Sequence, residues 1–126
     1  MNINSEKIKF KKFLDKNENR IFEGGKRFGS ESKINNDTLI SIITVVKNKS
    51  EYIQETIDSI KNQKYKNIEH IIIDGVSTDG TVEIVKKNID SIDYFVSEPD
   101  LGNYDAINKG ISLCTGELIG IVNADD

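Results

Sequence analysis

The fold of this chain is decided by the stretch Ile68-Glu69-His70-Ile71-Ile72-Ile73-Asp74-Gly75-Val76-Ser77-Thr78-Asp79-Gly80-Thr81. Its first half is rich in isoleucine and ends on the carboxylate of Asp74, and its second half consists of glycine and small polar residues. A helical pattern then opens at Val82. An apolar run followed by turn residues and a helix is typical of one strand of a parallel sheet with its crossover helix. Because ligands bind beyond the carboxyl ends of such strands, Asp74 stands where a binding group is useful.

The same alternation continues on both sides of this stretch. Residues 39–46 form a β-branched run typical of a buried strand, and residues 50–62 carry apolar side chains at helical spacing. After a helix carrying Val82, Val85 and Ile89, the pattern predicts a strand at 92–96, a helix from Asn103 and a strand at 118–122. The spacing in the last helix puts three side chains on its buried side, namely Tyr104, Ile107 and Ile111. The sequence therefore predicts an α/β fold, Rossmann-like, with a mainly parallel sheet, alternating helices and right-handed crossovers.

Composition limits the function classes. At 126 residues the chain is one domain at most, with 37% hydrophobic and 30% charged residues, as in ordinary globular proteins. Its single cysteine, Cys114, excludes an internal disulfide and gives no zinc-binding spacing. No stretch reaches the ~20 apolar residues of a membrane span. Residues 38–126 hold eight Lys and Arg against fifteen Asp and Glu, which argues against nucleic acid as a partner and favours a divalent cation.

Residues 1–37 differ in charge from the rest. They hold nine Lys and Arg against six Asp and Glu, and they include the pair Gly24-Gly25. We expect a basic N-terminal arm over 1–37, a short helix followed by irregular chain, ahead of a domain over 38–126. Two interpretations fit this arm: a solvated leader, or a peripheral contact between its cations and an anionic membrane surface.

Three polar clusters follow the predicted strands, namely Lys47-Asn48, residues 74–81 and residues 123–126. The carboxyl ends of parallel strands share one edge of the sheet, so we expect these clusters to converge. Asp125-Asp126 fits a divalent ion held by carboxylates and substrate phosphates, and it also fits a solvated turn. Its expected position opposite Asp74 favours the ion. A carboxylate that ends a strand of isoleucines needs hydrogen-bond donors around it.

Other polar side chains fit structural roles. His70, the single histidine, alternates within a strand and is interpreted as a packing or surface residue, and Cys114 as a small apolar filler. Three residues of the glycine-rich turn suit helix entry, namely Thr78, Asp79 and Thr81. No Ser-His-Asp or Cys-His set can be assembled, and no Walker or dinucleotide fingerprint is present.

Four motifs, in this order and at these strand ends, resemble the nucleotide-binding half of family 2 inverting glycosyltransferases with the GT-A fold. They are Ser41-Ile-Ile-Thr-Val-Val-Lys-Asn48, Ile72-Ile-Asp-Gly-Val-Ser-Thr-Asp-Gly-Thr81, Ser97-Glu-Pro-Asp-Leu-Gly102 with Tyr104-Asp-Ala-Ile-Asn-Lys-Gly110, and Gly116 to Asp126. The resemblance covers residues 39–126. It implies a partial GT-A fold and the transfer of a sugar from a nucleotide diphosphate sugar, with a UDP-sugar favoured, to a glycan or lipid-linked acceptor.

The resemblance also implies site residues and a setting. It assigns Val45 and Lys47 to the base site, Asp74 to the base or ribose, Asn108 to positioning the nucleotide-side loop, Asp125 to the ribose, and Asp126 to a divalent metal, Mn²⁺ or Mg²⁺. This metal would neutralise charge on the departing diphosphate. The implied setting is bacterial surface polysaccharide assembly in the cytoplasm, peripheral at the inner face of the plasma membrane.

Some features depart from the family pattern. Lys47 stands where an aromatic residue is common, no arginine lies between Ser97 and Asn108, and Asn123 replaces the first acidic residue of the metal motif. The family's acceptor-binding half and catalytic base lie beyond that motif, so we expect a truncated enzyme with little or no transfer activity alone. The alternatives are a nucleotide-sugar-binding module without turnover and a gene remnant.

Overall fold

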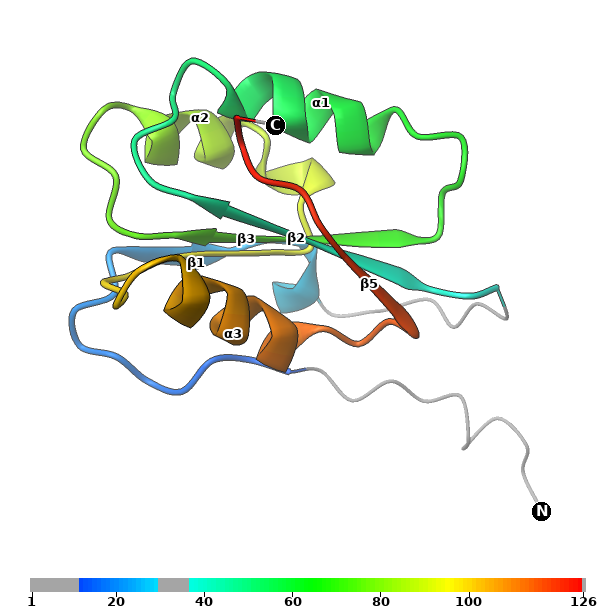
Figure 1. Ribbon diagram of the computed structural model, residues 1–126, viewed down its shortest axis with the longest axis horizontal. Helices are drawn as coiled ribbons and strands as arrows, with labels where there is room; N and C mark the ends of the chain where they lie inside the picture. The colour runs from blue at the N-terminus through cyan, green and yellow to red at the C-terminus, as the bar shows by residue number, and fades with distance from the viewer. Residues whose placement is uncertain (1–11, 30–36, 126) are drawn as a thin grey trace.

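The computed structural model describes residues 12–29 and 37–125. Within them lies one sheet in the order β1-β4-β3-β2-β5 (Figure 1). The strands are β1 (Phe22–Gly24), β2 (Ile40–Val46), β3 (Ile68–Asp74), β4 (Tyr94–Ser97) and β5 (Leu118–Ile121). β5, β2, β3 and β4 pair in parallel, whereas β1 pairs antiparallel with β4. The predicted α/β fold with a mainly parallel sheet is confirmed.

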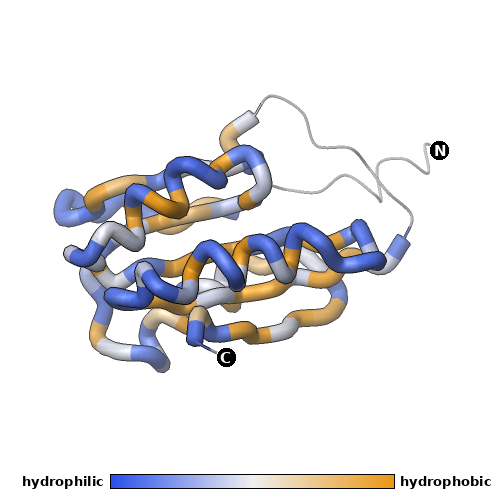
Figure 2. Tube along the Cα trace, turned by 90° about the horizontal axis from the view of Figure 1, so that it is seen from above, coloured by the Kyte–Doolittle hydropathy of each residue, from blue (hydrophilic) through white to orange (hydrophobic). Residues whose placement is uncertain are grey.

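The helices form a layer on each face of this sheet (Figure 1). α1 (Ile53–Lys61) and α2 (Thr81–Lys87) cover one face, and α3 (Asn103–Leu113) covers the other. Two short 3-10 turns, η2 (Lys26–Phe28) and η3 (Ile89–Ser91), complete the described elements. Figure 2 shows strands that are largely hydrophobic beside helices that alternate hydrophobic and hydrophilic positions. This pattern is expected of a sheet buried between two layers.

A separate apolar core lies on each face. Successive side chains along a strand point to opposite faces of the sheet, so neighbouring isoleucines of β3 pack in different cores. The core under α3 contains Ile43, Val45, Ile71, Ile73, Tyr94, Val96, Ala106, Leu113 and Cys114. The core under α1 and α2 contains Val46, Ile53, Ile57, Ile72, Val82, Val85, Ile92, Phe95 and Ala124.

The predicted buried side of α3 is wrong for two of its three residues. Tyr104 is 86% exposed and Ile111 is 45% exposed, whereas Ile107 packs partly against the core. The buried residues of α3 are Ala106, Gly110 and Leu113. A Cβ atom at Gly110 would lie 2.5 Å from Cγ2 of Ile43, so the helix approaches β2 through its small residues. The spacing of large apolar side chains cannot reveal an interface that depends on small ones.

Part of the N-terminal arm belongs to the sheet. β1 was not predicted, and it is tied to β4 through the bond from Ile21 N to Ser97 O, at 2.7 Å. Phe13 and Phe28 pack on the ring of Tyr94, with centroid distances of 5.9 and 5.5 Å. The predicted short helix is absent at Phe13 and Leu14, and the rest of it lies outside the described residues. No helix among the described residues is long and apolar enough to cross a membrane.

Candidate functional site

The parallel strands β2, β3 and β4 end in register, so their carboxyl ends lie side by side along one edge of the sheet. Val46 is opposite Asp74, and Asp74 is opposite Ser97, so β2, β3 and β4 end together. The loop after β2 contacts the loop after β3, and it also reaches Asp125 beyond β5. The prediction that the three polar clusters converge is therefore confirmed for the described residues.

Asp74 lies at the centre of this edge and is fully buried. Its Oδ2 accepts hydrogen bonds from Ser77 N at 2.9 Å and Ser97 Oγ at 2.7 Å, and its Oδ1 accepts one from Ser77 Oγ at 2.5 Å. The predicted need for donors around this carboxylate is confirmed. Ser97 was not singled out from the sequence, because its contact with Asp74 exists only through the pairing of β3 with β4. A nucleotide contact by Asp74 stays a prediction.

The loops after β2 and β3 are fastened together by side-chain to backbone hydrogen bonds. Asn48 N donates to Ser77 Oγ at 2.8 Å, and Thr78 N donates to Asn48 Oδ1 at 2.8 Å. Asn48 and Val76 have φ values of 53° and 60°. This left-handed conformation is uncommon for a β-branched residue such as valine and costs free energy, which marks the loop as a strained element of the edge.

The turn before α2 has the structural role predicted for it. Asp79 Oδ1 accepts hydrogen bonds from Thr81 Oγ1 at 2.6 Å and Thr81 N at 3.1 Å, and its Oδ2 accepts one from Ser50 N at 3.0 Å. The Thr81 hydroxyl and the Ser50 N–H lower the pKa of Asp79, because both stabilise the carboxylate. Asp79 therefore joins the start of α1 to the start of α2.

Asp125 is exposed at the same edge. Its Oδ2 lies 3.3 Å from Nζ of Lys49. The preceding residue, Ala124, is buried, and its carbonyl accepts a hydrogen bond from Thr56 Oγ1 at 3.0 Å. A cavity of about 270 Å³ adjoins this segment. It is lined by Tyr52, Glu55, Thr56, Ser59, Val122, Ala124 and Asp125.

A divalent metal site is not formed by the described residues alone. Over 12–29 and 37–125, no three His, Cys, Asp or Glu side chains are grouped to hold an ion. Asp125 offers one carboxylate, and that carboxylate faces an ammonium group. Asp126, the predicted metal ligand, lies outside the described residues. Sites for hard divalent ions draw on one or two carboxylates and substrate phosphates, so the metal prediction rests on Asp126.

The remaining predicted binding residues are dispersed. Val45 is 6% exposed and its side chain belongs to the core under α3, whereas Lys47 is exposed at the edge. Asn108 is exposed on α3, on the face of the sheet opposite α1. Lys47 and Asp125 are both exposed to solvent at one edge of the sheet. Among the described contacts, none joins the side chain of Asn108 to either of them.

His70 and Cys114 are buried, as interpreted from the sequence. His70 Nε2 lies 2.8 Å from Thr44 Oγ1. Burial, with the nearby charge of Lys26, lowers the pKa of His70 to about 4, so the ring is neutral near pH 7. Burial raises the pKa of the Cys114 thiol. Neither side chain has the ionisation expected of an acid–base group or an activated nucleophile.

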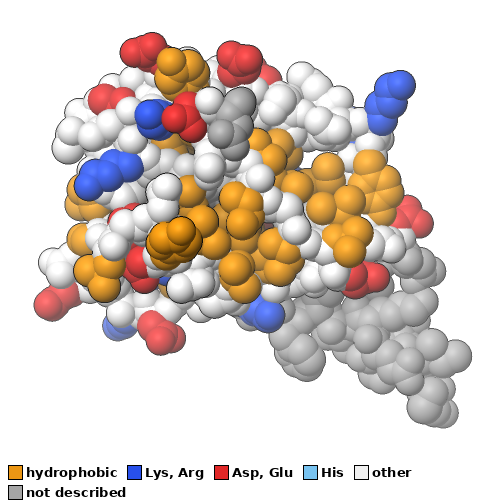
Figure 3. Space-filling view, viewed as in Figure 1, with side chains coloured by type: hydrophobic (Ala, Val, Ile, Leu, Met, Phe, Trp, Pro, Cys, Tyr) orange, Lys and Arg blue, Asp and Glu red, His pale blue; other side chains and the backbone are white. Residues whose placement is uncertain are grey.

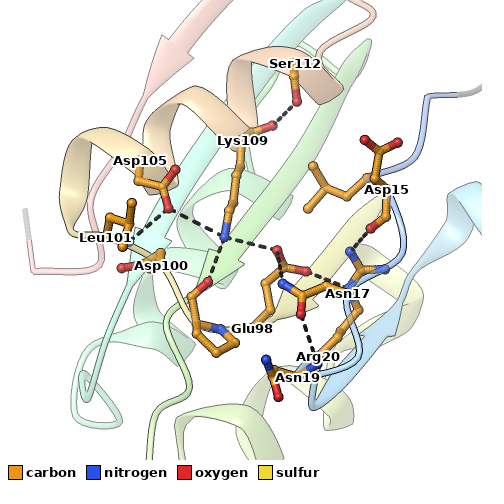
Figure 4. Close-up of polar contacts among 12 residues, drawn as sticks. Asp15, Asn17, Asn19, Arg20, Glu98, Asp100, Leu101, Asp105, Lys109 and Ser112 are labelled. Carbon is orange, nitrogen blue, oxygen red and sulfur yellow. Dashed lines mark hydrogen bonds and ion pairs between the residues drawn. The ribbon is translucent and has the colours of Figure 1, made fainter.

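Two buried carboxylates, Glu69 and Glu98, were missed from the sequence. Arg27 Nη2 lies 2.8 Å from Glu69, and Arg20 Nε lies 2.6 Å from Glu98 (Figure 4). Both cations come from the arm. Glu69 lies inside an apolar strand and Glu98 directly follows one, which is a sequence signal for a buried partner, but nothing in the sequence says which of the many cations pairs with each.

Comparison with known proteins gives one family. The model of glycosyl transferase family 2 matches residues 41–126. An uncharacterised glycosyltransferase of Mycobacterium tuberculosis is 39% identical over 88 residues, which cover 69% of this chain and 34% of that protein. The amylovoran biosynthesis glycosyltransferase AmsB of Erwinia amylovora is 36% identical over 95 residues, with coverage of 71% and 32%. The chain thus spans about a third of the length of these curated relatives.

Solved structures give the same picture. The mannosyltransferase PcManGT from Pyrobaculum calidifontis, in complex with GDP-Man and Mn²⁺, matches with a TM-score of 0.65 and 29% identity over 70% of this chain and 28% of its own. TarS of S. aureus, in complex with UDP-GlcNAc, matches with a TM-score of 0.62 and 25% identity over 69% and 26%.

Proposed function

This chain belongs to glycosyl transferase family 2 and has a GT-A-like fold, and on that premise we propose that it binds a nucleotide diphosphate sugar at the carboxyl-end edge of its parallel strands. The observation that carries the proposal is the convergence at that edge of the loops after β2 and β3 with Asp125. Open α/β sheets bind ligands at this position. The structural relatives whose titles name GDP-Man and UDP-GlcNAc support a nucleotide-sugar as the ligand.

We assign the predicted binding residues to different parts of such a donor. Lys47 supplies a cation and an apolar stem, and we assign it to the base site together with Val45, whose side chain is buried. Asp125 is assigned to the ribose hydroxyls. Asp74 already accepts three hydrogen bonds, so its proposed contact with base or ribose uses its remaining acceptor capacity. Asn108 is assigned to positioning the nucleotide-side loop.

A divalent metal, Mn²⁺ or Mg²⁺, is proposed at Asp126. When bound, it supplies positive charge that stabilises the leaving diphosphate. The relative whose title names Mn²⁺ supports this choice. The role of the chain's own residues is to present carboxylate oxygen beside the diphosphate and to balance the local charge through Lys49 and Asp125.

This chain matches about a third of the length of its relatives, so the activity of a whole enzyme is a further proposal. For it we propose inverting transfer of the sugar, UDP-linked by preference, to a glycan or lipid-linked acceptor. The catalytic base would come from the region of the relatives that this chain does not match. AmsB, named for amylovoran biosynthesis, supports surface polysaccharide assembly as the setting. We place the protein in the cytoplasm, peripheral at the inner face of the plasma membrane, with the domain over 38–126 as the donor-binding part and 1–37 as its arm.

Calorimetric titration tests donor binding. UDP and GDP are each titrated with and without Mn²⁺ into the wild type, Asp126→Ala and Asp90→Ala. Asp90 is an exposed carboxylate in η3, at the opposite end of the sheet, and serves as the matched control. We expect Mn²⁺-dependent binding that Asp126→Ala abolishes and Asp90→Ala retains. A folded wild-type sample that binds neither nucleotide would contradict the proposal.

A further inference from the structure

The segment Glu98–Gly102 lies directly beside the Asp74 loop. Ser97 Oγ donates to the carboxylate of Asp74, and Glu98 N donates to Asp74 O at 3.0 Å. A Cβ atom added to Gly75 would lie 2.7 Å from Oδ2 of Asp100, so the side chain of Asp100 is in contact with the first residue after β3. The position of this segment therefore sets one wall of the edge where the donor is proposed to bind.

Glu98, the first residue of this segment, anchors it through ion pairs. Its side chain is buried, and it is approached by cations from two separate parts of the chain (Figure 4). Arg20 Nε of the arm lies 2.6 Å from Oε1, and Lys109 Nζ of α3 lies 3.0 Å from Oε2. Asn17 Nδ2 adds a longer hydrogen bond to Oε2, at 3.4 Å. Glu98 thus joins the arm, the end of β4 and α3 at one point.

The backbone of the segment is fastened by α3 as well. Lys109 Nζ also donates to Pro99 O at 2.8 Å, and Asp105 Oδ2 accepts a hydrogen bond from Leu101 N at 2.9 Å (Figure 4). Asp100 Oδ1 accepts one from Gly102 N at 2.9 Å. These bonds fix the shape of the segment, and its Leu101 side chain, 94% exposed, extends into solvent.

Charge explains why the arm is needed. Burial disfavours the Glu98 carboxylate, and the hydrogen bonds from Arg20 and Lys109 outweigh this effect, so the pKa of Glu98 is lowered. Buried ion pairs add little net stability compared with apolar residues of the same size, and their best-attested use is to impose one specific arrangement. Arg20 is itself oriented, since its Nη1 lies 3.1 Å from Glu23 and its Nη2 donates to Asp15 O at 2.6 Å.

We propose that the arm is part of the donor-binding unit, with Arg20 as a positioning residue that, together with Lys109, fixes Glu98–Gly102 against the Asp74 loop. Arg20 acts through Glu98 and does not touch the donor. This inference rests on the proposed function, because it assigns the segment a place in the donor site.

Two measurements on the same variants test it. The first is the affinity for UDP or GDP with Mn²⁺, and the second is amide hydrogen exchange at Leu101 and Gly102. We expect Arg20→Gln to weaken nucleotide binding about ten-fold, as loss of an outer-layer partner commonly does, and to speed exchange at both amides while β3 keeps its protection. Arg20→Lys should restore part of both. Lys26→Gln is the control, since Lys26 is an arm cation paired with Asp93 at 3.7 Å near the amino end of β4.

The outcomes separate this inference from the proposed function. A wild type that binds no nucleotide contradicts both. A wild type that binds, with Arg20→Gln folded and equal in affinity, overturns only the inference, whether or not exchange at Leu101 has changed. If Arg20→Gln does not fold, Lys109→Gln removes the other support of the same segment and is held to the same ten-fold expectation, about the size seen for outer-layer partners. Equal affinity in that variant also overturns the inference.

Discussion

The two edges of the sheet differ in how they are finished. On the β1 side of the sheet, the arm forms two buried ion pairs, Arg20 with Glu98 just after β4 and Arg27 with Glu69 in the central strand β3. At the opposite edge, β5 pairs only with β2 among the described strands. Its side chains are largely exposed, with Leu118 at 57%, Ile119 at 49% and Ile121 at 47%. Figure 3 shows hydrophobic side chains gathered on the face that carries β5 and α3.

This difference shows how an edge strand can be protected from pairing with another chain. β1 is short and carries Glu23, which pairs with Arg20 at 3.1 Å, and both a short edge strand and charged side chains hinder pairing with another chain. The sequence of β5, Leu-Ile-Gly-Ile, has no charge, and its side chains are exposed on both faces of the sheet. An exposed apolar edge of this kind is a template for further strands or for association. Among the described residues, the arm that carries β1 is held by buried ion pairs, whereas no strand pairs with the outer side of β5.

The largest expected effect comes from breaking the buried pair between Arg27 of the arm and Glu69 of β3. Glu69 is 6% exposed. In Arg27→Met it keeps its hydrogen bonds from the hydroxyls of Ser41 and Thr115 but loses its charged partner. Leaving a buried carboxylate without its charged partner should lower the free energy of unfolding by about 3–5 kcal/mol. Urea denaturation followed by circular dichroism measures this. Lys26→Met is the control, because the Lys26 side chain is half exposed and its Nζ lies 3.7 Å from Asp93, so the loss of stability should be smaller than in Arg27→Met. Equal losses in the two variants would contradict the comparison.

A second effect, on the pH dependence of stability, comes from His70 of β3, which lies within the electrostatic influence of Lys26 in the arm. The pKa of His70 is about 4 when folded and 6.5 in its ordinary range. Between these values the unfolded chain binds a proton that the folded chain does not, so stability falls as the pH falls from 6.5 towards 4. The slope reaches about 1.4 kcal/mol per pH unit. Urea denaturation between pH 6.5 and 5 should show a larger fall in stability in the wild type than in His70→Gln, because the variant keeps the carboxylates, including Asp93 with its raised pKa, and lacks only the imidazole.

Because His70 is the single histidine, its ring gives an unambiguous NMR signal for the contact between the arm and β3. Lys26 of the arm contributes to the lowered pKa of His70 through its charge. Removing that charge in Lys26→Gln should raise the pKa of His70 slightly, and loosening the arm in Arg27→Met should raise it further. The chemical shift of the His70 ring followed against pH measures both. A titration near pH 6.5 in the wild type would show that His70 is not buried as described.

The smallest change in stability is expected at the β5 edge. Ile119→Lys places a charge on a strand whose side chain is half exposed, so the free energy of unfolding should change by about 0.5 kcal/mol or less. Self-association should fall, because a lysine on an edge strand opposes pairing. Ile21→Lys is the matched control at the other edge, where Ile21 is 60% exposed. Sedimentation velocity at increasing concentration distinguishes them, and equal behaviour of both variants with the wild type would mean that β5 is not an association edge.

The sequence was sufficient for the parallel strands and for the edge they form. Isoleucine runs bounded by turn residues gave β2, β3 and β5, and the Asp79 turn before α2 was readable because local hydrogen bonds decide it. The buried side of α3 was not readable, since Gly110 faces β2 for lack of a Cβ rather than for any hydrophobicity of its own. The partners of Glu69 and Glu98 were also out of reach, because Arg27 and Arg20 are far away in sequence.

The sequence by itself determined the α/β order, the family and the position of Asp74 at a ligand edge, because these depend on local periodicity and on short motifs. Only the tertiary structure decided that the arm supplies β1, that Ser97 completes the surroundings of Asp74, and that Arg20 reaches Glu98. These contacts depend on which strands become neighbours, and pairing between residues 23 to 78 positions apart leaves no local pattern in the chain.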